Sequence, residues 1–419
     1  MLNVGIDWGE KTLNTFSILN EEKVFVKEGQ VERSVAGALD LIDQIKEFQT
    51  DPDKVRIGID RKNDVLTRVL HSKGYQVFPL NPLSAERARK IYWPSGKKDD
   101  YTDSKVHALM IANDYQMWEP LKEENKRNKQ IQSLLQTRNS LARMQAQNRQ
   151  RLGSILSEAT PVISELCKNL RLCWVKDFLN KWPLHQDFHK AHGNRLNAFL
   201  NNHRVSDSTR EQIRSAWQKQ PYEHDRETAE CYRLRIQTLM DTISCLEEKI
   251  DRIEEKISEL LSKHKDREIF SSLPTNSENT IAALCTAFGP DRDQPYSWRN
   301  YSAYFGTSPI TEESGNSKIV EMRRSRDSVI YKALMDFADS TSRQEDCWAH
   351  TYYGRKRREG KSHYHALRCL ASRWVKILHT MWKKRTKYDE DFHRRRRRER
   401  GSKRSAKPTE VSQKENLSA

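Results

Sequence analysis

Acidic residues gather in the stretch 97–112, where Asp99, Asp100 and Asp103 stand close together. Apolar residues follow at helical spacing, which places these acids on the first turn of an amphipathic helix. Asp100 and Asp103 share one face of that helix, and two carboxylates so placed repel each other unless a cation lies between them. Because Mg²⁺ prefers oxygen ligands, the pair predicts part of a metal site. The alternative is a solvated first turn, where the helix dipole favours acids.

Two further aspartates end predicted strands. Residues 2–7 alternate toward Asp7, and the short apolar run 55–60 ends on Asp60. The ends of strands in an open sheet are places where side chains converge on a ligand. We therefore expect both aspartates to join Asp100 and Asp103 around one or two metal ions. Two-metal sites serve in-line phosphoryl displacement, because one ion activates the attacking oxygen and the other stabilises the leaving oxygen.

The elements that must position these acids have the pattern of an α/β domain. Runs 13–19 and 23–27 read as strands that form an antiparallel meander with 2–7. The remaining predicted elements are a helix over 35–48, a helix over 64–73, a strand over 76–80 and a turn at 81–82.

Length and charge narrow the class of partner. A chain of 419 residues predicts two or three domains, and its net charge of +16 predicts a polyanionic partner. Nucleic acid is the first candidate for this polyanionic partner. A membrane surface is the second, since no apolar run approaches the ~20 residues that span a bilayer. The N-terminus does not read as a signal peptide, and the seven cysteines form no C-x-x-C pair. We expect reduced thiols and a cytoplasmic, nucleoid-associated protein of a prokaryote.

The middle of the chain is helical. Residues 125–156 predict one long charged helix, and about 160–225 an inserted helical subdomain. From 236 to 260 apolar residues alternate in steps of three and four, which is the seam of a coiled coil. A second copy of the chain, giving a dimer or tetramer, is the partner we favour for this seam; the helix 125–156 of the same chain is the alternative. The seam residues are Ile236, Leu239, Ile243, Leu246, Ile250, Ile253, Ile257 and Leu260.

The C-terminal half reads as a second, mainly helical unit. Helices are predicted over 280–288, 298–305 and 365–382, and the first two end at glycine. Between them and the last helix lies 307–318, which we interpret as a polar loop because it has no apolar period. The arginine-rich tail 391–419 is expected to be disordered and to contact phosphates without sequence preference.

The first part of the chain resembles a known family. Val4-Gly5-Ile6-Asp7, Ile57-Gly58-Ile59-Asp60, Leu80-Asn81-Pro82 and the pattern Lys98-x-Asp100-x-x-Asp103 are similar to the RuvC-like domain of the DEDD-type insertion-sequence transposases. These recombinases are guided by a structured bridge RNA. The resemblance implies a ribonuclease-H-like α/β fold and a catalytic, Mg²⁺-binding tetrad, with Mn²⁺ as a second possible ion. The tetrad would be Asp7, Asp60, Asp100 and Asp103. This sequence departs from the family at Asp60, where a glutamate is usual.

The C-terminal half resembles the transposase domain of the same family. A Phe-Gly-x-x-Pro turn, a Ser-Gly loop, a basic segment and Tyr-Tyr-x-x-(basic)-Gly-Lys follow one another. The resemblance implies that the loop serine, Ser314, is the nucleophile, and that Gly315 lets the backbone approach a phosphate. It also implies a composite site with metals from another subunit. Taken alone, Ser314 reads as an ordinary turn serine. Candidate phosphate contacts are Arg323, Arg324, Arg326, Arg355, Lys356, Arg357, Arg358 and Lys361.

These observations predict a DNA transposase or recombinase that cuts and rejoins insertion-sequence ends and target DNA under RNA guidance. The predicted domains are 1–118 (RuvC-like), 119–265 (helical, with the coiled coil) and 266–390 (transposase), before the tail. One alternative is a metal-dependent, junction-resolving nuclease that cuts with water. The other is a catalytically inactive relative that binds nucleic acid.

Overall fold

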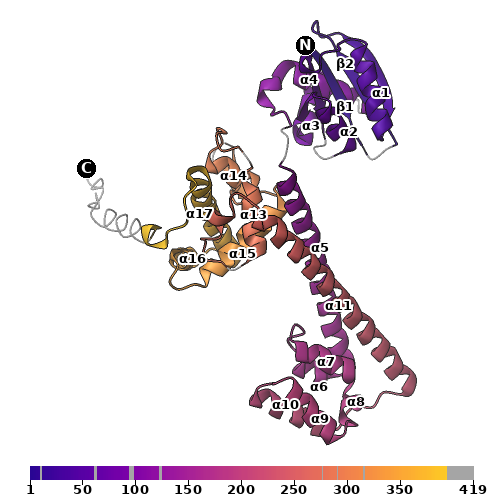
Figure 1. Ribbon diagram of the computed structural model, residues 1–419, viewed down its shortest axis with the longest axis vertical. Helices are drawn as coiled ribbons and strands as arrows, with labels where there is room; N and C mark the ends of the chain where they lie inside the picture. Colours follow the sequence, from indigo (N-terminus) through magenta and orange to yellow (C-terminus); the bar gives the residue numbers. More distant parts are fainter. Residues whose placement is uncertain are drawn as a thin grey trace, which may run out of the picture. The chain divides into compact units, whose positions relative to one another are not determined.

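The computed structural model describes residues 1–9, 12–60, 64–93, 99–121, 125–275, 277–289, 291–314 and 317–393. The tail from 394 onward, for which we predict disorder, lies outside the described residues. The chain forms two compact units, Met1–Glu123 and Glu124–Ala419 (Figure 1).

A five-stranded sheet forms the centre of the first unit. Its strands are β1 (Leu2–Asp7), β2 (Leu13–Leu19), β3 (Phe25–Glu32), β4 (Val55–Ile59) and β5 (Gln76–Pro79). They lie in the order β3-β2-β1-β4-β5. The first three strands are antiparallel, whereas β1, β4 and β5 run parallel. The predicted mixed α/β domain, including its antiparallel meander, is confirmed.

Side chains of β1 alternate between the two faces of the sheet, as strand geometry requires. Val4 and Ile6 enter a core with α1 (Val35–Lys46) and α2 (Val65–Ser72). Gly5 faces the other way, toward α4 (Asp100–Asp114). The helix α4 therefore covers the face opposite α1 and α2.

Two glycines let α4 lie directly on the sheet. A Cβ atom at Gly5 would stand 1.9 Å from the backbone oxygen of Ser104, and one at Gly58 would stand 2.7 Å from Ile111 Cγ1. Gly5 and Gly58 are neighbours in the register of β1 and β4. A side chain at either position would push the helix away from the strands.

One helix of this unit is absent from the sequence-based prediction. Asn81 and Pro82, which we interpret as a turn, begin α3 (Pro82–Tyr92), and the Asn81 side chain accepts a hydrogen bond from the Leu83 amide. An N-cap asparagine followed by proline is a common helix start. Ala85, Ala88 and Tyr92 of α3 pack on the small core that α4 forms with β5.

Two long helices form an antiparallel hairpin in the second unit, α5 (Lys126–Ala159) and α11 (Arg226–Ser262). Ile236 packs in one core with Leu152, and Ile257 packs in another with Ile131. Arg138 and Glu254 form an ion pair of 2.8 Å between the two helices. The apolar seam is therefore covered by α5 of the same chain. This is the alternative to the oligomeric partner that we favour from the sequence.

A small helical bundle joins the ends of this hairpin. It comprises α6 (Pro161–Leu166), α7 (Cys173–Lys181), α8 (His185–His189), α9 (Gly193–Asn202) and α10 (Asp207–Gln218). Phe178 is fully buried, with Trp182, Phe188 and Phe199 around it at ring-centroid distances of 5.4, 4.9 and 5.9 Å. Aromatic packing of this kind gives the bundle a core of its own.

The C-terminal part packs its helices around Trp374 and Trp382. These helices are α12 (Arg267–Phe270), α13 (Glu278–Ala287), α14 (Trp298–Tyr304), α15 (Ser328–Ser342), α16 (Trp348–Arg358) and α17 (His363–Lys384). Glycines with positive φ follow α13 and α14, at Gly289 and Gly306, as the sequence predicts.

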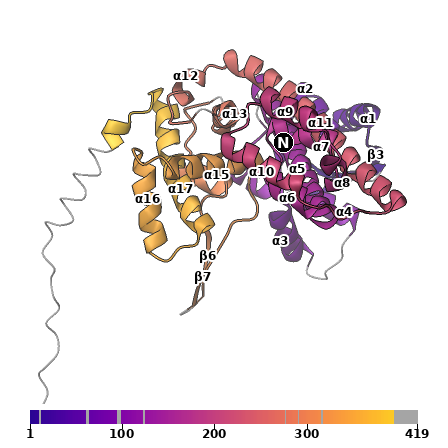
Figure 2. The ribbon, with the colours of Figure 1, turned by 90° about the horizontal axis from the view of Figure 1, so that it is seen from below.

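The prediction of a polar loop over 307–318 is wrong. The segment contains a two-stranded antiparallel ribbon, β6 (Ile310–Ser314) and β7 (Ser317–Glu321), which extends from the helices in Figure 2. Both strands are short and mostly polar, so hydrophobic alternation does not reveal them. They pair with each other through their backbones, and Ile319 and Val320 remain more than half exposed.

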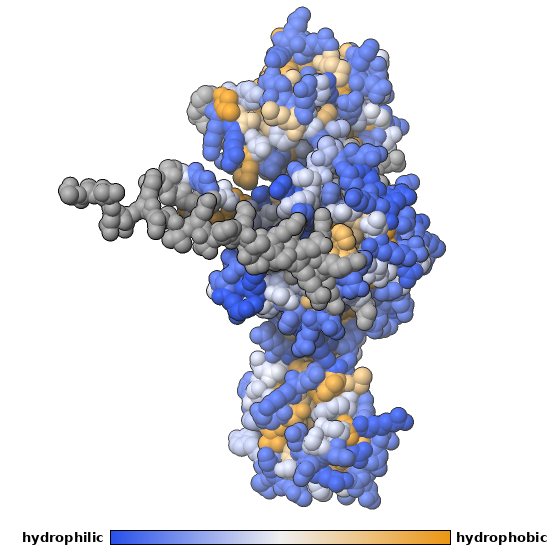
Figure 3. Space-filling model, turned by 90° about the vertical axis from the view of Figure 1, so that its left-hand side faces the viewer, coloured by the Kyte–Doolittle hydropathy of each residue, from blue (hydrophilic) through white to orange (hydrophobic). Residues whose placement is uncertain are grey.

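The face drawn in Figure 3 is largely hydrophilic, with apolar side chains in scattered patches. Across the described part of the chain, no helix is long and apolar enough to cross a membrane.

Candidate functional site

The two strand-end acids lie beside each other. Ile6 of β1 pairs with Ile59 of the parallel strand β4, so Asp7 and Asp60 follow at the same edge of the sheet. Each stands two residues after a glycine that faces α4. Because side chains alternate along a strand, both carboxylates project toward the helix that carries the other two acids.

Hydrogen bonds fix the first turn of α4 against this edge. Asp99 caps the helix by accepting from the Thr102 amide at 2.6 Å. Thr15 Oγ1 donates to the Asp100 carbonyl at 2.7 Å, and Thr15 is also the cross-strand partner of Asp7. The hydroxyls of Ser17 and Ser104 hydrogen-bond at 2.7 Å in the interior. The structure therefore brings the sequence-predicted Asp7, Asp60, Asp100 and Asp103 to one edge of the sheet.

One carboxylate oxygen of Asp60 lies in an unusual environment. Its Oδ1 is buried and accepts no hydrogen bond from the described residues. A buried carboxylate oxygen without a donor is costly, and a bound cation would offset that cost. Aspartate at this position, in place of the glutamate usual in the family, thus presents an oxygen suited to coordination.

Asp103 already has a cationic partner. Arg89 Nη1 lies 2.8 Å from Asp103 Oδ1, and both side chains are mostly buried, with 17% and 24% of their surfaces exposed. The sequence-based prediction does not include Arg89, because it places only a turn at 81–82 and no helix after it. The asparagine-proline start of α3 is the signal that would have revealed the helix.

His107 is a second residue that the sequence did not single out. It stands one turn after Asp103 on α4, and its Nδ1 lies 2.8 Å from the Ile6 carbonyl oxygen. Burial lowers its pKa, while the Ile6 carbonyl and the charges of Asp60 and Asp103 act in the opposite direction. A neutral ring donates from Nδ1 to that carbonyl, which ties α4 to the end of β1.

The donor set fits a hard divalent cation. Carboxylate oxygens are the ligands that Mg²⁺ and Mn²⁺ prefer, and Asp60 Oδ1 is buried with no hydrogen-bond partner in the part of the chain that the structure describes. In the described ranges, no three histidine, cysteine, aspartate or glutamate side chains are grouped closely enough to hold a metal ion as they stand. The metal tetrad therefore stays a prediction, and its four carboxylates would have to come closer together to share an ion.

Ser314 ends β6 and pairs with Ser317, so it stands where the ribbon turns. Its side chain is exposed, as an attacking hydroxyl must be, and Gly315 lies outside the described residues. Its assignment as the nucleophile is not tested by these features and stays a prediction.

Arg326 supports the base of this ribbon. Its guanidinium lies 3.9 Å from the Tyr331 ring centroid and donates to the Arg323 carbonyl at 2.8 Å. A Cβ atom at Gly306 would stand 2.4 Å from Arg326 Cδ, so the Phe-Gly turn packs on the arginine stem. Contacts within the protein therefore hold Arg326, which we predict to contact a phosphate.

The other predicted phosphate contacts differ in how they are held. Arg324 and Arg358 are exposed. On α16, Glu359 lies 3.7 Å from Arg355 and 2.5 Å from Lys356, and Arg357 donates to the Lys361 carbonyl at 2.7 Å. Arg324 and Arg358 are thus the clearest candidates for phosphate binding.

The mixed sheet, covered on one face by α4, has the architecture expected of a RuvC-like domain, and a mostly helical region follows it. Comparison with known proteins agrees. The family model of the IS110-type DEDD transposases, described as "Transposase", matches residues 4–161, and the model "Transposase IS116/IS110/IS902 family" matches residues 267–354. The chain belongs to the IS110 family of DEDD transposases.

Two proteins of Streptomyces coelicolor are similar to this chain. The "Mini-circle putative transposase for IS117" is 23% identical over 396 residues, covering 92% of this chain and 95% of that protein. The "Insertion element IS110 uncharacterized 43.6 kDa protein" is 27% identical over 154 residues, covering 37% of this chain and 38% of that protein. Membership of a transposase family implies DNA cleavage and rejoining.

Proposed function

We propose that this transposase exchanges DNA strands at insertion-sequence ends and target sites through Ser314, with a divalent metal held by Asp7, Asp60, Asp100 and Asp103. The observation that carries the proposal is the placement of α4 over Gly5 and Gly58, because Asp7 and Asp60 follow these glycines by two residues on parallel strands. Oδ1 of Asp60, which is buried and has no partner among the described residues, is the feature that best fits a cation.

The protein's part in the metal chemistry is to supply and hold oxygen ligands. When bound, Mg²⁺ at such a site stabilises negative charge that develops on a phosphodiester and lowers the pKa of an attacking hydroxyl. Thr15 and Ser104 hold the first turn of α4 to β2. His107 holds the same helix to β1. These contacts fix the backbone from which Asp100 and Asp103 extend.

The serine step exchanges one ester bond for another. Ser314 Oγ forms a bond to a DNA phosphorus and gives up its proton, while the bond from phosphorus to a deoxyribose oxygen breaks and that oxygen takes up a proton. In the reverse step the hydroxyl of a different DNA end attacks the phosphorus and gives up its proton. The bond from phosphorus to Ser314 Oγ then breaks, Oγ takes up a proton, and the strands are rejoined. An exposed serine at the tip of a ribbon is accessible to such a backbone phosphate.

Phosphate contacts position DNA but carry little sequence information. Arg324 and Arg358 are exposed for this role, and the chain's net charge of +16 favours a polyanion. We propose that a structured guide RNA supplies sequence choice, and that the active form is a homo-oligomer. Since α5 covers the seam of α11, other surfaces would join the copies.

The decisive experiment is a denaturing gel of labelled donor-end DNA incubated with Mg²⁺, co-purified RNA and the full-length protein. Wild type is compared with Ser314→Ala and with Asp100→Asn, while Ser317→Ala, across the ribbon turn, is the matched control. We expect a protein-linked DNA band in wild type and in Ser317→Ala only. Asp100→Asn should abolish cleavage but retain nucleic-acid binding, because it removes a metal ligand and no phosphate contact.

Free cut DNA from both wild type and Ser314→Ala would instead indicate a nuclease that cuts with water. Cleavage by Asp100→Asn at the wild-type rate would rule out the tetrad. A protein that binds DNA and guide RNA without cutting in any variant would support the inactive relative.

A further inference from the structure

We infer that Arg89 exchanges partners during the reaction: it binds Asp103 in the metal-free protein and a DNA phosphate once a metal ion has taken Asp103. The inference rests on the proposed metal tetrad. It makes Arg89 a positioning residue that couples metal binding to DNA binding.

The first observation is the ion pair itself. A guanidinium at 2.8 Å from Asp103 Oδ1 neutralises one member of the predicted tetrad. A divalent cation and a guanidinium compete for the same oxygen, and the two positive charges repel each other. Metal binding through Oδ1 of Asp103 therefore requires Arg89 to move.

The second observation is how lightly α3 is attached. No residue of α3 is buried, and the exposed fractions of Leu83 and Ile91 are 64% and 74%. Beyond the Arg89 pair, its described side-chain contacts with α4 are the packing of Ala85, Ala88 and Tyr92 and a hydrogen bond of 2.9 Å from Asn113 to Tyr92. Such a helix can shift more easily than one whose residues are buried.

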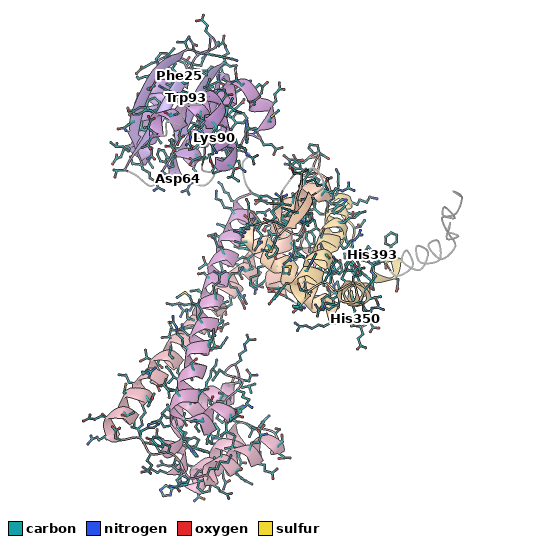
Figure 4. All side chains as sticks on the ribbon, turned by 180° about the vertical axis from the view of Figure 1, so that it is seen from behind. Phe25, Asp64, Lys90, Trp93, His350 and His393 are labelled. Atoms are coloured by element: carbon teal, nitrogen blue, oxygen red, sulfur yellow. The ribbon has the colours of Figure 1, made fainter. Side chains whose placement is uncertain are left out.

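The third observation concerns where a displaced arginine would go. Its planar fork fits the paired oxygens of a phosphate as well as those of a carboxylate. Arg87 and Lys90, the latter labelled in Figure 4, are exposed on the same helix, so α3 carries further cations that favour a polyanion. A scissile phosphate brought to this edge would therefore satisfy the guanidinium that the metal displaces.

Exchange of this kind predicts positive coupling. In the absence of DNA, metal binding must break the Arg89–Asp103 pair without compensation. With DNA present, the phosphate takes Arg89 and the metal binds more tightly, and by linkage the metal strengthens DNA binding by the same factor.

Electron paramagnetic resonance of Mn²⁺ tests the inference without measuring activity. Free Mn²⁺ is titrated against the full-length protein, with and without a DNA duplex of arbitrary sequence at low salt. We expect Arg89→Gln to tighten Mn²⁺ binding without DNA by about two- to five-fold, the range for a partly exposed ion pair. Added DNA should tighten binding to wild type and have less effect on Arg89→Gln.

Lys90→Gln is the matched control. Lys90 neighbours Arg89 on α3 but pairs with Glu86 at 3.0 Å, so its loss removes the same charge without freeing Asp103. Mn²⁺ affinity should stay near the wild-type value. Arg89→Lys keeps a cation opposite Asp103 and should also behave like wild type.

The outcomes separate this inference from the proposed function. Unchanged or weaker Mn²⁺ binding by Arg89→Gln, in a protein whose wild type binds Mn²⁺ through Asp103, would overturn the exchange and leave the tetrad standing. If Lys90→Gln tightened binding equally, general charge would be the cause and the exchange would be wrong. Absence of Mn²⁺ binding by wild type, with and without DNA, would overturn the tetrad and the exchange together.

Discussion

At the scale of residues, single atoms decide whether the candidate site is assembled. The α4 backbone occupies the space that a Cβ atom at Gly5 would need, and Asp60 buries an oxygen to which no described residue donates a hydrogen bond. The motif Val4-Gly5-Ile6-Asp7 therefore has two roles. Gly5 allows α4 to pack closely on β1, and Asp7 directs its carboxylate toward the same helix.

Gly5→Ala should destabilise the first unit strongly. The added Cβ would stand 1.9 Å from the Ser104 oxygen and 2.2 Å from the Ala108 nitrogen, both backbone atoms that cannot yield without moving α4. We expect a loss of about 3 kcal/mol in the free energy of unfolding, measured by urea denaturation.

Gly153→Ala is the matched control for this variant. Gly153 lies inside α5, and a Cβ atom there meets nothing within 4 Å. Alanine should stabilise this helix by about 0.5–1 kcal/mol. Equal stability of Gly5→Ala and wild type would mean that α4 does not lie against β1 as described.

At the scale of elements, more than one partner helix could cover the apolar stripe of α11. The spacing along α11 defines which side chains are buried, and Ile236, Ile243 and Ile257 are indeed buried. The spacing does not specify the partner, because any complementary helix would cover it. In this protein α5 covers the apolar stripe of α11. Ion pairs such as Arg149 with Glu247 at 2.8 Å align the two helices.

The double variant Ile243→Asp and Ile250→Asp should therefore disrupt the hairpin within one chain. Both side chains are buried, with 2% and 7% exposed, and two unpaired carboxylates there cost several kcal/mol. Far-UV circular dichroism should show loss of helix and a lower midpoint of thermal unfolding. Leu234→Asp, at a site that is 69% exposed, should leave both unchanged. A variant that keeps its helix but loses mass in light scattering would instead place the seam between copies.

Acid should weaken the junction between the hairpin and the C-terminal helices. Burial lowers the pKa of His264 below its usual 6.5, and its Nδ1 accepts a hydrogen bond of 3.1 Å from the Asp266 amide, which a protonated ring cannot do. The unfolded chain then binds more protons than the folded one, so stability is full above about pH 6.5 and falls as the pH drops below it.

Urea denaturation across this range measures the effect. His264→Gln should flatten the decline in the free energy of unfolding between about pH 7.5 and pH 5.5, because glutamine does not titrate. His192→Gln, at an exposed position, should keep the wild-type slope. A decline as steep in His264→Gln as in wild type would assign the acid sensitivity to other groups.

At the scale of the whole molecule, charge determines the class of partner. An excess of Lys and Arg over Asp and Glu, 74 against 58, favours polyanions throughout the chain, and family membership makes DNA that partner. The structure adds which cations are already committed to protein contacts, as Arg326 and Lys356 are, and which are exposed, as Arg324 and Arg358 are.

Replacing both exposed arginines, Arg324→Gln with Arg358→Gln, should reduce the dependence of DNA affinity on salt. Two lost phosphate contacts lower the slope of log affinity against log salt by about 2. Fluorescence anisotropy with labelled duplex DNA at several salt concentrations measures this slope. Lys168→Gln, at a site that is 72% exposed on the helical bundle, should leave it unchanged. An equal drop in both proteins would show that net charge alone sets the slope.

The sequence by itself determined the features that local periodicity and composition encode. Strands ending on Asp7 and Asp60, a helix starting at Asp100, a basic chain and a continuous apolar seam all follow from spacing and residue type. Only the tertiary structure decided what each surface meets. It placed α5 on the seam, Arg89 on Asp103, and a β-ribbon where the sequence read as a loop. Periodicity fixes the face that a residue occupies, whereas the partner across that face comes from distant parts of the chain, chosen by packing and charge that no local pattern contains.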